Sequence, residues 1–414
     1  MTVAPPEWET SSIGDVTTKP LKCEPANTGR ETVQYVDIGL LDGPTECLTQ
    51  APEVRIESAP SRCRQVIAVE DTLYSTVRPY LRKIAFVHGG LDGEFASTGY
   101  CVLRPSQKIH PRFLYYFTLS KQFEDQILPL QKGVSYPAVL DREVRAQRIW
   151  YPGLAEQRQI VEIVQEHLSH LNRAEAALAQ SRQRSRSMVA SARRRLVDQA
   201  REGSKTWRIG DVAAVSTGTT PSRAQARYYE GGTIPWITSG DLASGFVQEA
   251  SQFVTSAALT ETSLKLYPPG TLLVAMYGEG KTRGTVAELG LAATTNQACA
   301  AVQVRNPELR SWVRMLLEAN YIAMRRLAAG GVQPNLNLGL IRNIEVPVPE
   351  EATRLRLMGE VEAVLKAARA LALETDGAVA RLTALRKTVL KAAFQGKLTG
   401  RHTDADVIEE MAHV

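Results

Sequence analysis

Cysteine is scarce in this sequence, and its few positions lie far apart. The five cysteines are odd in number and form no CxxC pair: Cys23, Cys47, Cys63, Cys101 and Cys299. This pattern is typical of unpaired thiols in a reducing compartment, and it argues against a disulfide framework or a cysteine-ligated zinc site. We therefore expect a cytoplasmic protein.

Long apolar runs are also missing. No stretch of about 18 consecutive apolar residues occurs, although a membrane-spanning helix needs about that many. The first residues, MTVAPPEWET, contain neither the basic segment nor the apolar segment of a secretion signal. Membrane spanning and secretion are not expected.

Recognisable catalytic motifs are a third absence. The histidines form no HExxH motif, no Asn-Pro-Pro-aromatic loop of a methyltransferase is present, and no Pro-Asp plus Glu-x-Lys arrangement of a nuclease can be placed. Residues 275–282, AMYGEGKT, resemble the end of a phosphate-binding loop, but alanine replaces the first glycine and no clear helix follows. We expect no catalytic residue, metal or cofactor in this chain, so the chemistry must lie on partner proteins.

The chain is long enough to form more than one hydrophobic core. Its 414 residues are 44% hydrophobic, which favours two or three structural units. The net charge of +5 is mildly basic, so a polyanionic partner is allowed but not required.

Two proline-free stretches organise the chain, at 154–201 and 351–397. Apolar residues recur there at alternating spacings of three and four, over about five heptads between Leu357 and Ala392, and in 154–201 on both sides of an arginine-rich interval. A helix longer than about 25 residues with a narrow apolar stripe needs a partner helix. The sequence therefore predicts two long helices that pair antiparallel, each about 65 to 70 Å long.

The segments outside the helices are also repeated, at an offset of about 198 residues. Trp8 and SSIGDV match Trp207 and RIGDVAA, residues 35–43 match 235–245, and KGVSYPAVL matches GGVQPNLNL. We predict an α/β (α+β) fold with an internal pseudo-twofold repeat. Its parts are globules at 1–150 and 204–349, long helices at 151–203 and 350–400 that separate the globules, and a tail at 401–414.

These phrases and their order resemble the specificity subunit of type I restriction-modification enzymes. The similar phrases are PSRCRQVIAVEDTLYSTVRPYLRKIAFV and STGYCVLRP in the first globule, IPWITSGDL, GGVQPNLNL and IEVPVP in the second, and LAEQRQIV and LRKTVLKAAFQGKLTG in the helices. The resemblance extends over essentially the whole chain.

The resemblance implies a non-catalytic, prokaryotic host-defence protein that directs adenine methylation and restriction by partner subunits. Each globule would be a target recognition domain that reads one half of a bipartite, asymmetric target in double-stranded DNA. The helices would set the spacer and dock two methylation subunits, with restriction subunits joining in the full complex. S-adenosylmethionine, ATP and Mg²⁺ would bind the partners.

Candidate DNA contacts are polar side chains on loops, because arginine and lysine bind phosphate and guanine, and asparagine and glutamine bind adenine. The first globule offers Ser61, Arg62, Arg64, Arg78, Tyr80, Arg82, Lys83, Lys132, Ser135 and Tyr136. The second offers Thr219, Thr220, Ser222, Arg223, Thr238, Ser239, Tyr277, Lys281, Thr282, Arg283, Asn296, Gln297, Gln333 and Asn335. For any one of these arginines, a solvated or salt-bridged surface role remains an alternative.

Apolar positions off the helix seam are candidates for partner contact. These are Ile160, Ile163, Leu373 and Phe394, with packing onto the globules as the alternative. The arginine run from Arg182 to Arg195 is either a solvated helix face or a surface for DNA or acidic partners.

Two other classes of protein stay open at this point. An interaction protein could display two non-DNA-binding domains on a coiled-coil rod, and it would then show no salt-dependent DNA binding. A methyltransferase or nuclease in its own right is disfavoured by the missing motifs.

Overall fold

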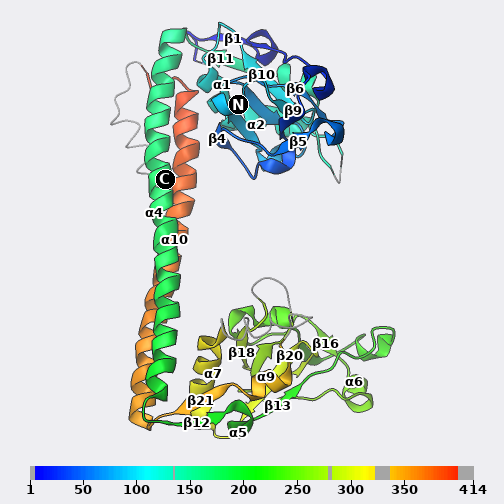
Figure 1. Cartoon of the computed structure of the whole chain (residues 1–414), viewed down its shortest axis with the longest axis vertical. Helices are drawn as coiled ribbons and strands as arrows, with labels where there is room; N and C mark the ends of the chain where they lie inside the picture. Colours follow the sequence, from blue (N-terminus) through cyan, green and yellow to red (C-terminus); the bar gives the residue numbers. More distant parts are fainter. Residues whose placement is uncertain (1–4, 134–135, 278–281, 322–335, 400–414) are drawn as a thin grey trace. The chain divides into compact units, whose positions relative to one another are not determined.

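The computed structural model describes residues 5–133, 136–277, 282–321 and 336–399. The chain divides into two compact units, which we call unit 1 (Met1–Ala179 with Thr375–Val414) and unit 2 (Gln180–Glu374). Each unit contains one mixed α/β globule and one pair of antiparallel helical segments (Figure 1).

A five-stranded sheet forms the centre of the unit 1 globule. Its strand order is β2-β10-β7-β8-β4, and all neighbours are antiparallel except β4 and β8. The strands are β2 (Thr17–Thr18), β4 (Thr45–Leu48), β7 (Thr72–Ser75), β8 (Ile84–Val87) and β10 (Tyr100–Pro105). The helices of the globule are α1 (Pro111–Leu119), α2 (Lys121–Ile127) and α3 (Asp141–Arg145).

Two smaller sheets complete this globule. The first has the order β5-β3-β9-β6, and the second pairs β1 with β11. Their strands are β1 (Glu9–Ser12), β3 (Thr32–Val36), β5 (Glu53–Arg55), β6 (Cys63–Val66), β9 (Phe95–Ser97) and β11 (Arg148–Tyr151).

Unit 2 repeats this architecture. Its five-stranded sheet has the order β13-β20-β17-β18-β15, again with one parallel pair at the β15 edge. A three-stranded sheet, β16-β14-β19, corresponds to β5-β3-β9, and β12 with β21 corresponds to β1 with β11. The strands are β12 (Lys205–Arg208), β13 (Ala213–Thr217), β14 (Ile234–Ile237), β15 (Phe246–Val247), β16 (Phe253–Val254), β17 (Leu272–Ala275), β18 (Val286–Leu289), β19 (Thr294–Thr295), β20 (Cys299–Val304) and β21 (Glu345–Val348). The helices are α5 (Ile209–Val212), α6 (Ser256–Glu261), α7 (Arg310–Ala319) and α9 (Leu338–Arg342).

The central strands are apolar on both faces because each sheet is covered on both sides. Alternate residues of a strand point to opposite faces. In β7 and β10, Tyr74 and Cys101 join the core beneath α1, whereas Leu73 and Tyr100 join a separate core on the other face. The equivalent strands β17 and β20 divide between two cores in the same way. Alternate residues of these continuously apolar strands therefore pack into two different cores, one on each face of the sheet.

The strand registers confirm the internal repeat and correct one detail of it. Tyr100 pairs with Ser75 as Cys299 pairs with Ala275. At the start of each globule, however, Ser12 opposite Arg148 corresponds to Arg208 opposite Glu345. Trp207 therefore lies within β12 and is 39% exposed, whereas Trp8 precedes β1 and is buried. The predicted equivalence of the two tryptophans is wrong, because the strand registers place Trp207, unlike Trp8, at an exposed position within a strand.

The two long helices are α4 (Leu154–Arg201) and α10 (Glu351–Ala393). In unit 1, Val164 and Leu168 of α4 share a core with Val389 of α10, and in unit 2 Leu196 of α4 shares a core with Val361 of α10. Every predicted seam position of α10 from Leu357 to Ala392 is buried or half-buried, which confirms the heptad pattern. No helix within the described ranges has the length and apolar character needed to cross a membrane.

Helix α10 ends at Ala393 rather than at the predicted residue 397. Gly396 adopts a φ of +69°, and the amide of Lys397 donates to the carbonyl of Ala392 at 3.1 Å. A glycine in the left-handed region closes a helix because other residues are strained there. The phrase FQGK is thus the helix terminus, not its continuation.

Candidate nucleic-acid interface

Backbone hydrogen bonds join the candidate loops of unit 1 at one end of the sheets. The carbonyl of Arg62 accepts from the amide of Thr98 at 2.9 Å, and the carbonyl of Gly99 accepts from the amide of Thr76 at 2.9 Å. The amide of Arg78 then donates to the carbonyl of Pro137 at 2.7 Å. Residues 61–64, 76–80, 132–133 and 136–137, which are distant in sequence, therefore form one loop cluster, and the 98–99 turn is its central link.

A half-buried cation and an exposed aromatic ring stand out in this cluster. The Arg78 guanidinium carbon lies 4.7 Å from the centre of the Tyr136 ring, and Tyr136 is 70% exposed. Arg78 has a φ of +48°, a conformation that is uncommon for residues other than glycine and often found at functional sites. Ser61 and Arg62 are exposed on the neighbouring loop, and Tyr80 is 48% exposed. This combination can contact phosphate and stack on a base.

Four further predicted residues of unit 1, Arg64, Arg82, Lys83 and Lys132, are already bonded within the chain. The Arg82 side chain bonds the carbonyl of Leu119 and lies 3.7 Å from Glu124, and Lys83 Nζ donates to the carbonyl of Ile38 at 3.1 Å. These contacts direct Arg82 and Lys83 into the globule rather than toward the loop cluster.

Arg64 and Lys132, in contrast, form ion pairs with Glu24 and Glu143 whose charged groups are partly exposed. Exposed pairs of this kind contribute little stability and can exchange for phosphate at small cost.

The loops of unit 2 converge through a close backbone approach. A Cβ atom on Gly218 would lie 1.9 Å from the carbonyl oxygen of Thr295, so only glycine fits there. The amide of Thr219 donates to that carbonyl at 2.9 Å, and the Thr220 hydroxyl bonds the side chain of Gln297. The predicted segments 219–223 and 294–297 therefore lie side by side.

The indole of Trp236 connects a third segment to this group. Its Nε1 donates to the carbonyl of Thr219 at 3.2 Å, and the Arg223 guanidinium lies 5.9 Å from the centres of both the Trp236 and Tyr229 rings. Ser222 and Arg223 are exposed. Arg223 is therefore held over an aromatic support at the surface, where it can meet DNA.

Several predicted residues of unit 2 also have structural tasks. Thr238 caps a helical turn through two hydrogen bonds to Asp241 at 2.8 Å each, and Asn296 Oδ1 accepts from the amide of Ala298 at 3.1 Å. Ser239, Thr282 and Arg283 are half-buried, whereas Tyr277 is 39% exposed. Ser135, Lys281, Gln333 and Asn335 lie outside the described residues.

Two polar residues of these clusters were missed from the sequence. Thr98 follows β9 at the position that Gln297 holds after β19, so the repeat alignment alone was enough to find it. Ser263, whose hydroxyl lies 2.9 Å from that of Thr219, had no sequence signal because its segment joins the cluster only through the fold.

Metal-binding groups and reactive thiols were sought in the described part of the chain. It contains no group of three histidine, cysteine or acidic side chains that could hold a metal ion. Burial raises the pKa of Cys63 to about 11 and that of Cys299 to about 12, so both thiols stay protonated and unreactive at neutral pH.

The four predicted partner positions have different surroundings. Ile160 and Phe394 are buried in the unit 1 core, with 1% and 0% exposure. The prediction is corrected for these two, because packing against the globule leaves them no surface for a partner. Ile163 is half-buried against the same core, and Leu373 is 75% exposed. Leu373 is thus accessible and Ile163 partly so.

The comparisons with known proteins agree with this architecture. The family model for the type I restriction modification DNA specificity domain matches residues 5–180 and 201–353, which is more than half of the chain. The MjaIX specificity subunit of Methanocaldococcus jannaschii is 27% identical over 156 residues, and the EcoR124I/EcoR124II specificity subunit of Escherichia coli is 24% identical over 162 residues. These matches cover 35% and 38% of this chain, and only 34% and 40% of the two relatives.

Two solved structures resemble the chain over nearly its full length. One, from work on complex assembly and conformational transition of the type I R-M system, has a TM-score of 0.77 and 25% identity, covering 95% of this chain and 99% of the other. The HsdS subunit of Thermoanaerobacter tengcongensis has a TM-score of 0.53 and 25% identity, covering 95% and 98%. With its two family matches, its repeated globules and its long helices, the chain belongs to the type I restriction-modification DNA specificity family.

Proposed function

We propose that the two globules read the two halves of one bipartite, asymmetric target in double-stranded DNA. The observation that supports this most is that the globules share strand order and register but differ in the side chains of their equivalent loops. Thr98 in unit 1 corresponds to Gln297 in unit 2, and glutamine can bond adenine bidentately whereas threonine cannot. One scaffold with two sets of loop residues fits two different half-sites.

The loop clusters around Arg78 and Arg223 are the proposed reading surfaces. Each presents a guanidinium supported by an aromatic ring, together with hydroxyl or amide groups. Contacts to phosphate would position the globule, and contacts to base edges would supply specificity. Arg82 and Lys83 are left out of this surface because their side chains bond inside the globule.

The helices α4 and α10 are proposed to set the distance between the half-sites. Their seam residues pair them within each unit, and each helix continues from one unit into the other. A continuous α-helix has a fixed rise of about 1.5 Å per residue, so its length can act as a ruler. A pseudo-twofold arrangement of the two globules around the helices is part of this proposal.

The partners complete the proposed function. Two methylation subunits would dock on the helices, with exposed Leu373 as a candidate contact, and restriction subunits would join them. S-adenosylmethionine, ATP and Mg²⁺ would bind these partners, which would perform adenine methylation and restriction in a prokaryotic cytoplasm. The domain limits 1–150, 151–203, 204–349 and 350–400 are proposed as the modules of this function.

A domain exchange tests the modular reading of DNA. The chain with residues 204–348 replaced by the equivalent segment of a relative is combined with methylation subunits and S-adenosylmethionine, and the methylated sites are mapped. One half-site should change while the other half-site and the spacer stay the same. A change in both halves would contradict the proposal.

A second experiment separates this function from the alternatives. The purified chain alone should not methylate DNA, and adding the methylation subunits should give sequence-specific methylation. Methylation without partners would indicate an enzyme. Absence of sequence-specific, salt-dependent DNA binding even with partners would indicate an interaction protein with another ligand.

A further inference from the structure

The same turn precedes β10 in unit 1 and β20 in unit 2. It is formed by residues 97–100, between β9 and β10, and by residues 296–299, between β19 and β20. The strand registers align the two turns, because Tyr100 lies opposite Ser75 as Cys299 lies opposite Ala275. The second residue of each turn, Thr98 or Gln297, is therefore at an equivalent position.

Each turn presents one exposed side chain. Thr98 is exposed, and the other three residues of its turn are buried. Gln297 is exposed, and the other three residues of its turn are buried or half-buried. The fold thus places a single variable side chain at the surface of an otherwise covered turn, at the same position in both globules.

A short polar side chain fixes the backbone of each turn. Ser97 Oγ accepts from the amide of Gly99 at 3.2 Å, and Asn296 Oδ1 accepts from the amide of Ala298 at 3.1 Å. Serine and asparagine commonly stabilise turns by bonding the amide two residues further on. The two turns therefore have the same local support, although different residue types supply it.

A buried glutamine bonds both ends of the unit 1 turn. Gln65 in β6 is 2% exposed, and its Nε2 donates to the carbonyls of Ser97 and Tyr100 at 2.8 Å each. The register of β6 on β9 shifts between Cys63 and Gln65, and such a bulge redirects a side chain. Both protons of the Gln65 amide are thereby used on the turn that carries Thr98.

A threonine from a different strand bonds the unit 2 turn. The Thr217 hydroxyl lies 3.2 Å from the carbonyl oxygen of Gln297 and 3.1 Å from that of Cys299. Strand β13 reaches the turn because it pairs with β20 as far as Thr217 opposite Ala300, whereas β2 in unit 1 ends at Thr18. Each turn is therefore held by a side chain outside it, and the two supporting residues are not equivalent in the repeat.

The side chain of Gln297 is also oriented. The Thr220 hydroxyl donates to Gln297 Oε1, and no described residue accepts a hydrogen bond from its Nε2. An amide oxygen can accept two hydrogen bonds, so this side chain can still accept from and donate to a base edge, as the recognition of adenine requires. The shorter Thr98 offers a hydroxyl and a methyl group instead.

From these observations we propose that Thr98 and Gln297 determine specificity at one base pair in each half-site, and that Gln65 and Thr217 are positioning residues that act through them. The inference rests on the proposed function and deepens it, because it assigns one reading position in each globule and the group that fixes it.

Methylation of duplexes with single changed base pairs tests the two reading positions. The full chain is combined with methylation subunits and S-adenosylmethionine, and kcat/KM is measured for the mapped target and for each changed duplex. Gln297→Thr should reduce discrimination about tenfold at one base pair of one half-site. Thr98→Gln should change the preference at one base pair of the other half-site. Gln248→Thr, at an exposed glutamine outside the loop cluster, should leave discrimination unchanged.

The positioning residues are tested at the base pairs that these variants identify. Thr217→Val removes the hydroxyl and keeps the shape, so it should relax discrimination at the base pair changed by Gln297→Thr. In a Gln297→Ala background, Thr217→Val should have no further effect on discrimination, because its effect passes through Gln297. Thr271→Val removes a buried hydroxyl that donates to the Pro268 carbonyl at 2.8 Å in the same globule, and it should keep full discrimination.

The buried Gln65 is tested in the same way. Gln65→Met should relax discrimination at the base pair changed by Thr98→Gln and leave the other half-site as it was. Urea unfolding of the variant shows whether it folds. If it does not, Thr98→Gln still decides the reading position of unit 1, and Thr217→Val decides whether a supporting residue controls specificity.

Three results would overturn the proposal. Unchanged discrimination at every base pair in both Gln297→Thr and Thr98→Gln would remove the assigned reading positions. A Thr217→Val variant that slows methylation of all duplexes by one factor would have a structural role only. Effects of Thr217→Val and Gln297→Ala that add would show that the two residues act independently.

The domain exchange of residues 204–348 separates these failures from failure of the proposed function. If the exchange changes one half-site while the variants of Thr98 and Gln297 change nothing, only the present inference is wrong. If the exchange changes neither half-site, the proposed function itself is wrong.

Discussion

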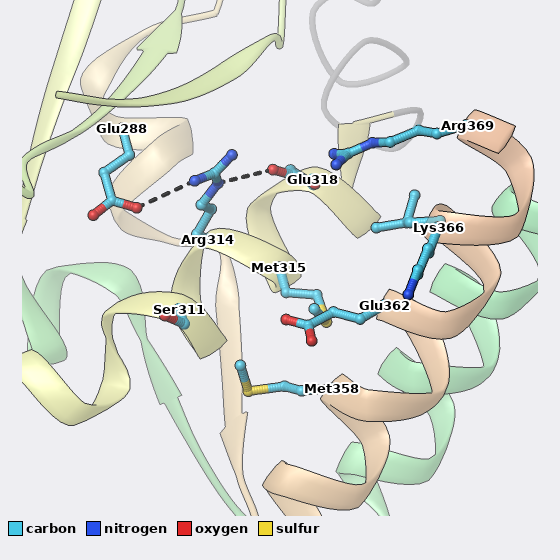
Figure 2. A pocket seen from close by; sticks show the side chains of 10 residues that line it. Glu288, Ser311, Arg314, Met315, Glu318, Met358, Glu362, Lys366 and Arg369 are labelled. Atoms are coloured by element: carbon cyan, nitrogen blue, oxygen red, sulfur yellow. Dashed lines mark hydrogen bonds and ion pairs between the residues drawn. The ribbon is translucent and has the colours of Figure 1, made fainter. Parts of the chain in front are cut away.

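Arg314 donates to Glu288 at 3.2 Å at the place in the second repeat where Tyr115 packs against Phe86 in the first. The strand registers make Glu288 the equivalent of Phe86, because Glu288 lies opposite Leu272 as Phe86 lies opposite Thr72. Each also contacts the helix that follows the last strand of its five-stranded sheet, as Figure 2 shows for Glu288 and Arg314. The two repeats have therefore kept one backbone frame while exchanging an aromatic pair, with 5.6 Å between ring centroids, for an ion pair. This difference makes the stability of each unit separately testable.

Arg314→Met should lower the free energy of unfolding of unit 2 by about 2 kcal/mol. The substitution leaves Glu288 and Glu318, which are 19% and 22% exposed, without the guanidinium between them. Urea unfolding measures the loss. Arg356→Met is the matched control, because it removes an exposed pair with Glu360 and should cost less than about 0.5 kcal/mol.

Transplanting the aromatic pair should recover part of this loss. The double variant E288F/R314Y puts a pair of the unit 1 type, phenylalanine with tyrosine, in place of the ion pair, and it leaves no carboxylate at 288 to be desolvated. We expect it to be more stable than Arg314→Met alone in the same urea titration. An equal or lower stability would show that the surrounding core of unit 2 does not accept the pair.

Asp71→Asn should destabilise unit 1 by about 3 kcal/mol. The Asp71 carboxylate is fully buried and accepts two hydrogen bonds from Arg104, at 2.9 and 2.8 Å, which join β7 to β10. Removing its charge leaves the guanidinium without a counter-ion. Thermal unfolding of the variant measures the effect, and Glu24→Gln, which breaks the exposed pair with Arg64, should change stability little.

Gly218→Ala should weaken DNA binding about tenfold or more, which is about 1.4 kcal/mol. The added methyl group would meet the carbonyl of Thr295, forcing apart the loops that hold Thr220 and Gln297. Fluorescence anisotropy with a target duplex measures affinity, and methylation mapping should show relaxed specificity in one half-site. Gly359→Ala, on α10 with no atom within 4 Å, should bind DNA normally.

Acid should destabilise the chain partly through His110. Burial lowers the pKa of His110 from its ordinary value of 6.5, and its Nδ1 has no hydrogen-bond partner among the described residues. The unfolded chain therefore takes up this proton at a higher pH than the folded chain does. The free energy of unfolding is unaffected above about pH 6.5 and falls as the pH drops below it.

Urea unfolding at about pH 5.5 and about pH 7.5 measures this effect. The difference between the two values should shrink in His110→Gln, because glutamine does not titrate. His88→Gln, at an exposed histidine, should preserve the wild-type difference. An unchanged difference in His110→Gln would exclude His110 as the source.

Lengthening both helices should change the spacer and leave both half-sites intact. Four residues added between Ala179 and Gln180, and four between Glu374 and Thr375, add about 6 Å, which corresponds to about two base pairs. Methylation mapping of the assembled complex measures the spacer. An insertion in α4 alone should instead abolish activity, because the seams of the two helices would no longer match.

The sequence by itself determined the long helices, the internal repeat and the family. The seam between Leu357 and Ala392 follows from the regular spacing of apolar residues along the sequence. Such spacing predicts one helix face reliably because every helical turn has the same geometry. The match between residues 35–43 and 235–245 could likewise be predicted from the sequence, since both segments form the equivalent strands β3 and β14. Arg223 was also predicted on a loop and is exposed, whereas Arg78 is half-buried.

Only the tertiary structure decided which of the candidate residues are free to act. Arg78 and Arg82 are four residues apart and alike in sequence, yet Arg78 stacks on Tyr136 whereas Arg82 bonds Leu119 and faces Glu124. Phe394 was predicted as a contact for a partner protein, but Trp150 Nε1 donates to its carbonyl at 2.8 Å and its ring is buried in the core. Such outcomes depend on contacts between residues distant in sequence, which no local pattern encodes.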